Sequence, residues 1–285
     1  MFGFLNVSKP EKITSHDVVS YLRKITKEKQ IGHAGTLDPF ATGILPIAIG
    51  KATRLIEYLP DDKEYLALIC FGKNTDTYDR DGQVIFESEK KVQKDEVVET
   101  LKEFKGEIEQ FPPMYSAIKV NGKKLYEYAR EGKSIDIKPR KVYIERIELK
   151  KFDFEKQMAQ ILVKCSKGTY IRSIAYDLGK KLECGAYLSE LTRSQAGNFR
   201  IEDAISLYDI KTVEDVERFL EPVKLNMPQM ELSDYENNKI SVGQFIKNEK
   251  NFSNGDTIVL KYNGEIKAIA KVYENIIKAE KVFNL

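Results

Sequence analysis

The sequence predicts an α+β fold with a largely antiparallel sheet, followed by a small β-rich C-terminal domain. Strand-like and helix-like segments follow one another without the regular alternation that is typical of parallel α/β proteins. The length of 285 residues corresponds to about two domains of roughly 150 residues each. An irregular, proline-containing segment after residue 220 separates an acidic helix from a short β-rich stretch, so we expect the domain boundary there.

The first predicted elements follow from cap residues and apolar periodicity. Ser15 can cap a helix that runs to about Lys27, with its apolar residues on one face. Residues 65–71 are β-prone and apolar, which predicts a buried strand. The Asp-Gly pair at 81–82 indicates a turn, so residues 83–86 are the predicted hairpin partner of that strand.

The same criteria predict the elements of the middle and the end of the chain. Helices are expected at 95–106 with Asp95 as cap, at 123–131, at 169–185 and at 212–220. Long paired strands are expected at 142–152 and 158–165. The C-terminal stretch contains a capping box at 233–236 and a hairpin that joins 257–262 to 266–272.

The composition is that of a soluble globular protein, with 42% hydrophobic and 32% charged residues. No apolar run approaches the roughly 20 residues that span a bilayer, and no secretory leader is recognisable. The three cysteines are widely spaced and odd in number, which favours a reducing compartment over a disulfide framework. Without Cys-x-x-Cys pairs or clustered histidines, a zinc site is not expected. We therefore expect a cytoplasmic protein without a metal centre.

The net charge of +2 conceals a strong segregation of charge along the chain. Residues 118–151 contain 11 Lys/Arg and 5 Asp/Glu, a local net charge of +6. Residues 202–236 contain 3 Lys/Arg and 10 Asp/Glu, a local net charge of −7. Tyrosines within the basic stretch can stack on bases. This pattern favours a face that binds a polyphosphate such as RNA.

Residues 32–46, with the sequence GHAGTLDPFATGILP, are the most informative segment. Asp38 is its only carboxylate, no other acid occurs between Glu28 and Glu57, and His33 is one of only two histidines. Its glycines and prolines exclude a long helix. Local chemistry leaves two interpretations open: a catalytic acid, or an Asp-Pro turn whose carboxylate binds its own backbone.

The whole segment closely resembles the catalytic-aspartate motif of the TruB family of tRNA pseudouridine synthases, which modify uridine 55 in the T loop. Further segments resemble other motifs of this family in the right order, from about Phe4 to Arg200. They are NVSKP at 6–10, KEY at 63–65, PMYSA at 113–117, GKKLY at 122–126, SKGTYIR at 166–172 and LTR at 191–193. One departure is Lys12, because the family usually has a glycine at that position.

The resemblance implies a pseudouridine synthase fold with a central mixed sheet and a function for several residues. It assigns a catalytic domain to residues 1–222, with an RNA-binding insertion at about 106–151, and a PUA-like RNA-binding domain to residues 223–285. Asp38 is the implied catalytic carboxylate, and Arg172 is its implied ion-pair partner. Tyr65 is expected either to stack on the target uracil or to move its C5 proton. Tyr170, Leu191 and His33 are expected to line the substrate pocket.

The implied substrate is the T arm of tRNA, whose target base must be flipped out of the loop. His33 is expected to contact the rearranged loop. The residues expected to bind RNA are Lys9, Pro10, His33, Lys63, Lys119, Lys123, Lys124, Arg130, Arg140, Lys141 and Arg193. The reaction breaks the N1–C1′ bond and joins C5 to C1′ without redox or hydrolysis. No cofactor, metal or guide RNA is therefore expected, and we expect a monomer.

Three alternatives remain open at this stage. The protein could be an RNA-binding or RNA-folding protein without chemistry, or a guide-RNA-dependent pseudouridine synthase. A hydrolytic glycosidase is disfavoured because no second carboxylate lies near Asp38 in the sequence. A distant carboxylate could still approach Asp38 in space.

Overall fold

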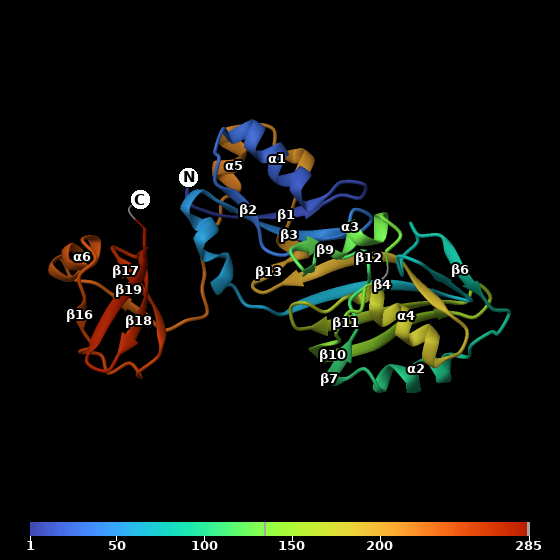
Figure 1. Ribbon diagram of the computed structural model, residues 1–285. Helices are drawn as coiled ribbons and strands as arrows, with labels where there is room; N and C mark the ends of the chain where they lie inside the picture. The colour runs from blue at the N-terminus through green and yellow to red at the C-terminus, as the bar shows by residue number, and fades with distance from the viewer. Residues whose placement is uncertain (134, 284–285) are drawn as a thin grey trace.

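The computed structural model describes residues 1–133 and 135–283. Residues 134 and 284–285, which fall in the predicted insertion and the predicted C-terminal domain, lie outside this part. Figure 1 shows a large body built on a curved sheet with helices, and a smaller β-rich body at the C-terminal end of the chain. The predicted α+β class and the small β-rich C-terminal unit are confirmed.

The large body is organised around a mixed sheet of ten strands. Eight of them lie in the order β14 (Ile205–Ser206), β1 (Gly3–Lys9), β3 (Thr42–Ile49), β12 (Ala186–Ala196), β4 (Lys63–Phe71), β11 (Met158–Cys165), β10 (Arg140–Asp153) and β7 (Gly106–Gln110). β2 (Ile31–His33) pairs with β3, and β13 (Phe199–Arg200) pairs with β12. Only β1–β14 and β3–β12 are parallel. The sheet is therefore largely antiparallel, and the predicted pair β10–β11 is present.

The predicted hairpin after β4 is wrong. β6 (Val84–Glu87) pairs with β5 (Lys73–Thr75), and together they form a separate two-stranded sheet. Both edges of β4 are occupied by β11 and β12, which arrive from much later in the chain. The backbone N–H and C=O groups of β4 form their hydrogen bonds with β11 and β12. The residues around the turn at 81–82 therefore form the separate hairpin of β5 and β6.

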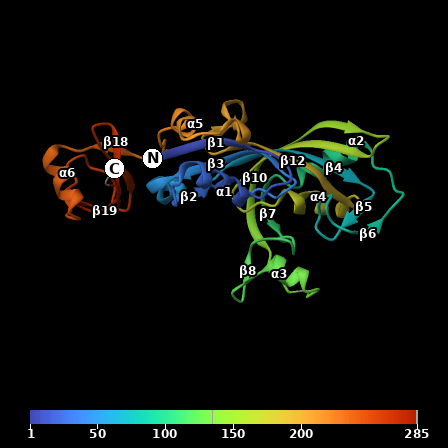
Figure 2. The same ribbon diagram turned by 90° about the horizontal axis from the view of Figure 1, so that it is seen from above.

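Helices cover separate parts of the sheet. α1 (Ser15–Thr26) and α5 (Val213–Phe219) pack over β1 and β3, while α2 (Lys94–Lys102) and α4 (Ile171–Lys181) pack over β10 and β12 (Figure 1). A 3-10 helix, η1 (Gly50–Tyr58), follows β3. Figure 2 shows β8 (Lys119–Val120) and α3 (Leu125–Arg130) projecting from the large body, within the predicted insertion. Lys123–Lys124, predicted as helix, form the short strand β9, which pairs with β8.

Two predicted helix caps are shifted by one or two residues. The side chain of Thr14, not Ser15, accepts the capping hydrogen bond from the backbone N–H of Asp17. The hydroxyl of Ser15 is instead engaged with the backbone of Leu37. α2 is capped by Gln93 instead of Asp95, and it ends at Lys102 before the chain enters β7.

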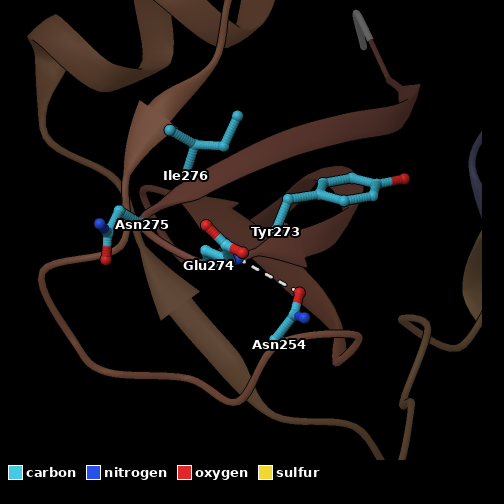
Figure 3. A pocket seen from close by; sticks show the side chains of 5 residues that line it. All are labelled: Asn254, Tyr273, Glu274, Asn275 and Ile276. Carbon is cyan, nitrogen blue, oxygen red and sulfur yellow. Dashed lines mark hydrogen bonds between the residues drawn. The ribbon is translucent and has the colours of Figure 1, made fainter.

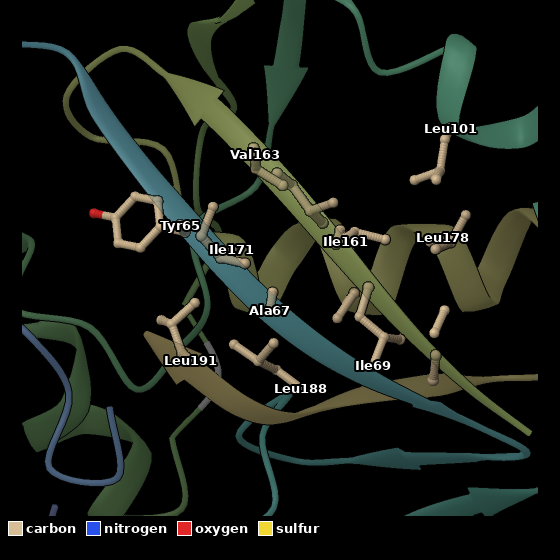
Figure 4. Packing of buried hydrophobic residues seen from close by; sticks show 14 of the residues in the cluster. Tyr65, Ala67, Ile69, Leu101, Ile161, Val163, Ile171, Leu178, Leu188 and Leu191 are labelled. Carbon is tan, nitrogen blue, oxygen red and sulfur yellow. The ribbon is translucent and has the colours of Figure 1, made fainter. Parts of the chain in front are cut away.

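The main core lies between α2, α4 and the strands β4, β11 and β12 (Figure 4). Alternate residues of β4 point into it, and they include Tyr65, Ala67 and Ile69. Tyr65 lies at the end of this row, and its hydroxyl points away from the packed aliphatic side chains (Figure 4). Because side chains alternate between the two faces of β4, Tyr65 lies on the core face, with its hydroxyl at the edge of the core.

The small body contains a five-stranded sheet in the order β15 (Gln229–Glu231), β17 (Thr257–Tyr262), β18 (Glu265–Tyr273), β19 (Ile276–Val282) and β16 (Ile246–Lys247). The predicted hairpin β17–β18 and the capping box of α6 (Asp234–Ser241) are present. A shallow hollow lies where Asn254 meets the β18–β19 turn, and the side chain of Asn254 accepts a hydrogen bond from the backbone N–H of Glu274 (Figure 3). This hollow is far from the sequence motifs.

A continuous apolar cluster joins the two bodies. β1 and β3 turn one set of alternate residues toward α1, and the other set, with Phe4 and Ile44, toward the small body. Phe283 is 1% exposed in this second cluster, and it also contacts the ring of Phe2 and the guanidinium of Arg54. The small body is therefore docked through apolar packing. Within residues 1–133 and 135–283, no helix is long and apolar enough to cross a membrane.

Truncation of Phe283 tests this docking. Phe283→Ala should lower the free energy of unfolding by about 3 kcal/mol, because it leaves a cavity in the apolar cluster that joins the two bodies, the joint core. Phe245→Ala is the matched control: its ring is 56% exposed, and its change should stay within about 0.5 kcal/mol. Urea unfolding followed by circular dichroism measures both. Equal destabilisation by the two variants would contradict the joint core.

Candidate active site

Asp38 lies in the loop between β2 and β3, and buried polar groups hold this loop. Ser15 at the start of α1 binds both backbone groups of Leu37: its hydroxyl accepts from the N–H at 2.9 Å and donates to the carbonyl at 3.2 Å. The backbone N–H of Lys12 donates to the carbonyl of Pro39 at 2.8 Å. These bonds fix the residues on both sides of Asp38, whose side chain is 32% exposed.

Arg172 from the first turn of α4 binds the Asp38 carboxylate with two nitrogen atoms. Its Nη2 donates to Oδ1 at 3.0 Å, and its Nε lies 2.9 Å from Oδ2. Arg172 is 5% exposed and also donates to the carbonyls of Thr77 and Tyr115. This two-point contact holds the carboxylate in one orientation.

A second carboxylate, Asp79, completes the surroundings of Arg172 and was not predicted as a site residue. Its Oδ2 lies 3.3 Å from Nη1 of Arg172, and its Oδ1 accepts from Thr77 Oγ1 at 2.6 Å. Burial raises the pKa of Asp79, while the hydrogen bond from Thr77 and the charge of Arg172 oppose this rise. The only sequence indication was an acid in a turn-rich stretch, 41 positions after Asp38.

Asp79 bears on the glycosidase alternative, because a distant carboxylate does approach Asp38. It is only 5% exposed, and it faces the same guanidinium as Asp38 from the other side. A buried counter-ion of Arg172 is not placed to activate water at a sugar. We therefore interpret Asp79 as a group that orients Arg172.

Tyr65 and Leu191 lie on the neighbouring strands β4 and β12 and are both 7% exposed. Burial raises the pKa of Tyr65, and the positive charge of Arg193 opposes this rise. Tyr170 is the N-cap residue of α4, and its backbone is clamped by the side-chain amide of Gln110. Burial also raises the pKa of Tyr170. The predicted catalytic Tyr65 and two predicted pocket residues, Tyr170 and Leu191, are thus held by secondary structure.

His33 ends β2 and is half-buried. Burial lowers its pKa, and the charges of Arg193 and His16 lower it further. The ring is therefore neutral at physiological pH. Its Nδ1 is buried and has no well-aligned hydrogen-bond partner among the described residues, although a hydrogen bond with the backbone of Gly35 partly opposes the fall in pKa.

Two of the predicted RNA-binding residues are wrong as direct phosphate contacts. Lys9 is 0% exposed, and its ammonium group donates to the carbonyls of Pro10, Ile13 and Pro39. Arg193 is also 0% exposed, and its guanidinium donates to the carbonyls of Ile44 and Gly35. A cation enclosed in this way cannot reach a phosphate. Both residues instead bind the loop that carries Asp38, Lys9 through the carbonyl of Pro39 and Arg193 through that of Gly35.

The other predicted RNA-binding residues remain accessible. Lys119, Arg130, Arg140 and Lys141 are exposed, and Pro10, His33, Lys63, Lys123 and Lys124 are half-buried. In the insertion, Lys123 lies over the ring of Tyr128, while Lys124 and Arg130 lie over Tyr126. The structure thus groups cations and aromatic rings on the projecting segment with β8 and α3.

The departure at Lys12 has a structural consequence. Lys12 has a φ of +69°, in the left-handed region that favours glycine. A glycine would adopt this conformation without steric strain. The lysine keeps the turn, and its backbone N–H still binds Pro39.

The described residues contain no cluster of three or more His, Cys, Asp or Glu side chains that could hold a metal ion. The arrangement provides an oriented, accessible carboxylate beside a buried guanidinium and a buried phenol. A carboxylate of this kind can attack an electrophilic carbon or accept a proton. The phenol can act as a general acid or base.

Two profiles of one protein family match the chain. Residues 23–171 match the profile of the N-terminal domain of the TruB family pseudouridylate synthases. Residues 172–225 match that of the tRNA pseudouridylate synthase B C-terminal domain. The chain belongs to the TruB family. The second matched region contains α4 and β12, so in this TruB protein it is part of the large sheet.

Curated TruB relatives resemble the chain over most of its length. A protein named tRNA pseudouridine synthase B from Caldanaerobacter subterraneus subsp. tengcongensis is 45% identical, with 88% of each chain covered. Its namesake from Carboxydothermus hydrogenoformans is 40% identical over 99% of each chain. A solved structure of an H/ACA RNP bound to a substrate RNA containing 2′-deoxyuridine superposes with a TM-score of 0.75 and 26% identity, over 100% of this chain and 86% of that one. The chain is thus a pseudouridine synthase in fold and enzyme class.

Asp79→Asn tests the orientation of Arg172. The amide nitrogen would face the guanidinium and repel it, so Asp38 would lose its fixed partner, and we expect turnover to fall about 100-fold. Asp81→Asn is the control, because the Asp81 side chain is 62% exposed. Single-turnover release of tritium from uridine C5 measures both. If the two variants react at the same rate, Asp79 does not orient Arg172.

Proposed function

We propose that this protein converts uridine to pseudouridine at position 55 in the T loop of tRNA, using Asp38 as its catalytic carboxylate. The observation that carries the proposal is the two-point contact between Arg172 and Asp38. It supports the tRNA specificity only together with the TruB membership and with the relatives that bear the name tRNA pseudouridine synthase B. We place the reaction in the cytoplasm and assign it to a monomer that acts alone.

The proposed reaction begins with a flipped uridine whose C1′ lies at the exposed side of Asp38. Arg172 orients the carboxylate, so that it can assist cleavage of the N1–C1′ bond by attack or by proton transfer. The uracil then turns and joins C1′ through C5. Loss of the C5 proton and gain of a proton at N1 complete the isomerisation without any net consumption of water or electrons.

The proposed RNA contacts divide into two surfaces. The accessible residues of the insertion, with Lys124 and Arg130, would bind phosphates and stack on exposed bases. His33, which is half-buried at the end of β2, would contact the T loop next to the flipped base. The small C-terminal body, which we assign to the PUA type with a boundary near residue 222, would add contacts to the tRNA arm.

The guide-dependent alternative has one supporting observation, the superposition on an H/ACA RNP structure at a TM-score of 0.75. The sequence relatives favour independent action, because proteins named tRNA pseudouridine synthase B match at 40–45% identity. Activity of the purified protein on a bare T-arm stem-loop decides between the two. The non-catalytic RNA-folding alternative predicts tight binding without any isomerised uridine.

Asp38→Asn is the direct test of the catalytic assignment. We expect at least a 10⁴-fold loss of pseudouridine formation, because the amide can neither attack carbon nor accept the proton. RNA binding and the thermal unfolding midpoint should stay near the wild-type values. The assay is tritium release from C5 of a T-arm stem-loop, without cofactor. Residual activity within about tenfold of wild type would overturn the assignment.

A pair of lysine variants tests the two predicted classes of cation. Lys124→Met should weaken RNA binding about tenfold, with a smaller salt dependence and an unchanged single-turnover rate at saturation. Lys9→Met should instead lower the rate and leave affinity nearly unchanged, because it removes the donor for three loop carbonyls. Filter binding at several salt concentrations and single-turnover kinetics measure these effects. The reverse pattern would restore Lys9 as a phosphate contact.

A further inference from the structure

Arg193 is a completely buried cation that the proposed reaction does not yet use. It is 0% exposed, and within residues 1–133 and 135–283 no carboxylate lies within 4.0 Å of its guanidinium. A buried charge without a counter-ion is unfavourable and calls for a specific role. Such a charge is suited to an anion that forms only during the reaction.

Two of the three guanidinium nitrogen atoms hold the Asp38 loop. Nε donates to the carbonyl of Ile44 at 2.7 Å, and Nη2 donates to the carbonyl of Gly35 at 3.1 Å. These carbonyls lie on either side of Asp38 in the chain. At Gly43 the backbone packs so closely on Arg193 that a Cβ would lie 2.3 Å from the Arg193 carbonyl oxygen. Arg193 is therefore locked against the loop.

The third nitrogen atom, Nη1, is buried and has no hydrogen-bond partner among the described residues. It lies beside Gly35, where a Cβ would approach it to 3.4 Å. Its N–H groups therefore make no well-aligned hydrogen bond, although a hydrogen-bonding contact with Arg193 helps to lower the pKa of the Tyr65 hydroxyl. Unsatisfied donors of this kind are rare in folded proteins and mark positions where a ligand or a reacting group completes the set.

Tyr65 is the direct neighbour of Arg193 across the sheet. The two residues are register partners in the antiparallel pair β12–β4, so their side chains leave the same face about 5 Å apart at Cβ. Cys165 from β11 and Asp38 from the loop also act on the Tyr65 hydroxyl, and both raise its pKa. Arg193 is the nearby cation that opposes them. Arg193 also lowers the pKa of three further groups, Lys9, His33 and Lys63, through its charge.

We propose that Arg193 is a positioning residue of the isomerisation, which clamps the Asp38 loop to β12 and stabilises the Tyr65 phenolate while the C5 proton of the uracil is removed. This inference rests on the proposed function. One role for Arg193 accounts for three observations. Its buried charge has no counter-ion, its Nη1 has no well-aligned acceptor, and the buried phenol of Tyr65 leaves the same face of the sheet. Arg193 acts through Tyr65 and the loop, without touching the substrate.

The proton transfer balances as follows. Tyr65 first loses its own proton to solvent and becomes a phenolate. After C5 has joined C1′, the C5–H bond breaks, and its proton forms a new O–H bond on that phenolate. The C5–H electron pair forms the C5=C6 double bond, and the electrons of the N1=C6 bond move to N1. N1 takes a proton from solvent, and Tyr65 is again a phenol.

The test compares Arg193→Met, which removes the charge, with Arg193→Lys, which keeps it. Arg200→Met is the control, because Arg200 is an exposed arginine on β13. Single-turnover rates are measured over a pH series with T-arm RNA carrying hydrogen or deuterium at C5 of the target uridine. In Arg193→Met, the rising limb of the profile of rate against pH should shift to higher pH by about one unit or more. Arg193→Met should also reveal a primary deuterium effect that wild type, Arg193→Lys and Arg200→Met do not show.

Two outcomes overturn the inference. In the first, the single-turnover rate of Arg193→Met falls by the same factor at every pH, and no isotope effect appears. A purely structural role of Arg193 predicts this result. The other is a wild-type profile for Arg193→Met.

If Arg193→Met does not fold, 3-fluorotyrosine incorporated into the wild-type protein acidifies the phenols and leaves Arg193 intact. The limb should then move to lower pH, and an unmoved limb overturns the phenolate role. A wild-type protein that releases no C5 hydrogen refutes the proposed function itself.

Discussion

The contact between Asp38 and Arg172 is the interaction on which the rest of the site depends. Its two residues lie 134 positions apart, one in a loop after β2 and the other in the first turn of α4. A carboxylate acts on a bound base only if it is held in a fixed orientation, and the guanidinium provides that constraint. Only a sheet that brings β3, β12 and β4 together can place α4 beside that loop. The mixed sheet order is thus the structural condition for the chemistry.

Buried cations form the scaffold around this pair. Lys9 donates to the carbonyl of Pro39 and Arg193 to that of Gly35, both in the loop that carries Asp38. Arg172 lies between Asp38 and Asp79. Burial lowers the pKa of Lys9 to about 8, which shows that enclosure of its charge is unfavourable. Such groups are retained when their hydrogen bonds set the geometry of a site. The accessible cations, by contrast, lie on the projecting insertion, where solvent and RNA can both reach them.

Several elements were predictable from local patterns, and the two main failures share one cause. The alternation at 142–152 and 158–165 predicted the pair β10–β11, and the capping box at 233–236 predicted the start of α6. The partner of β4 was wrong, because both of its edges pair with strands that arrive much later in the chain. Asp79 was missed for the same reason, since nothing in its local sequence indicates that it faces Arg172.

The sequence by itself determined the family, the motif order and the identity of the candidate carboxylate, because each of these is a property of short contiguous segments. It also indicated a basic, tyrosine-containing stretch. Only the tertiary structure decided which cations are buried and which are accessible. Lys9 and Lys124 look alike in the sequence, yet one is 0% exposed and the other is accessible. The physical reason is that burial and charge pairing depend on which strands and loops meet, and long-range packing alone determines that.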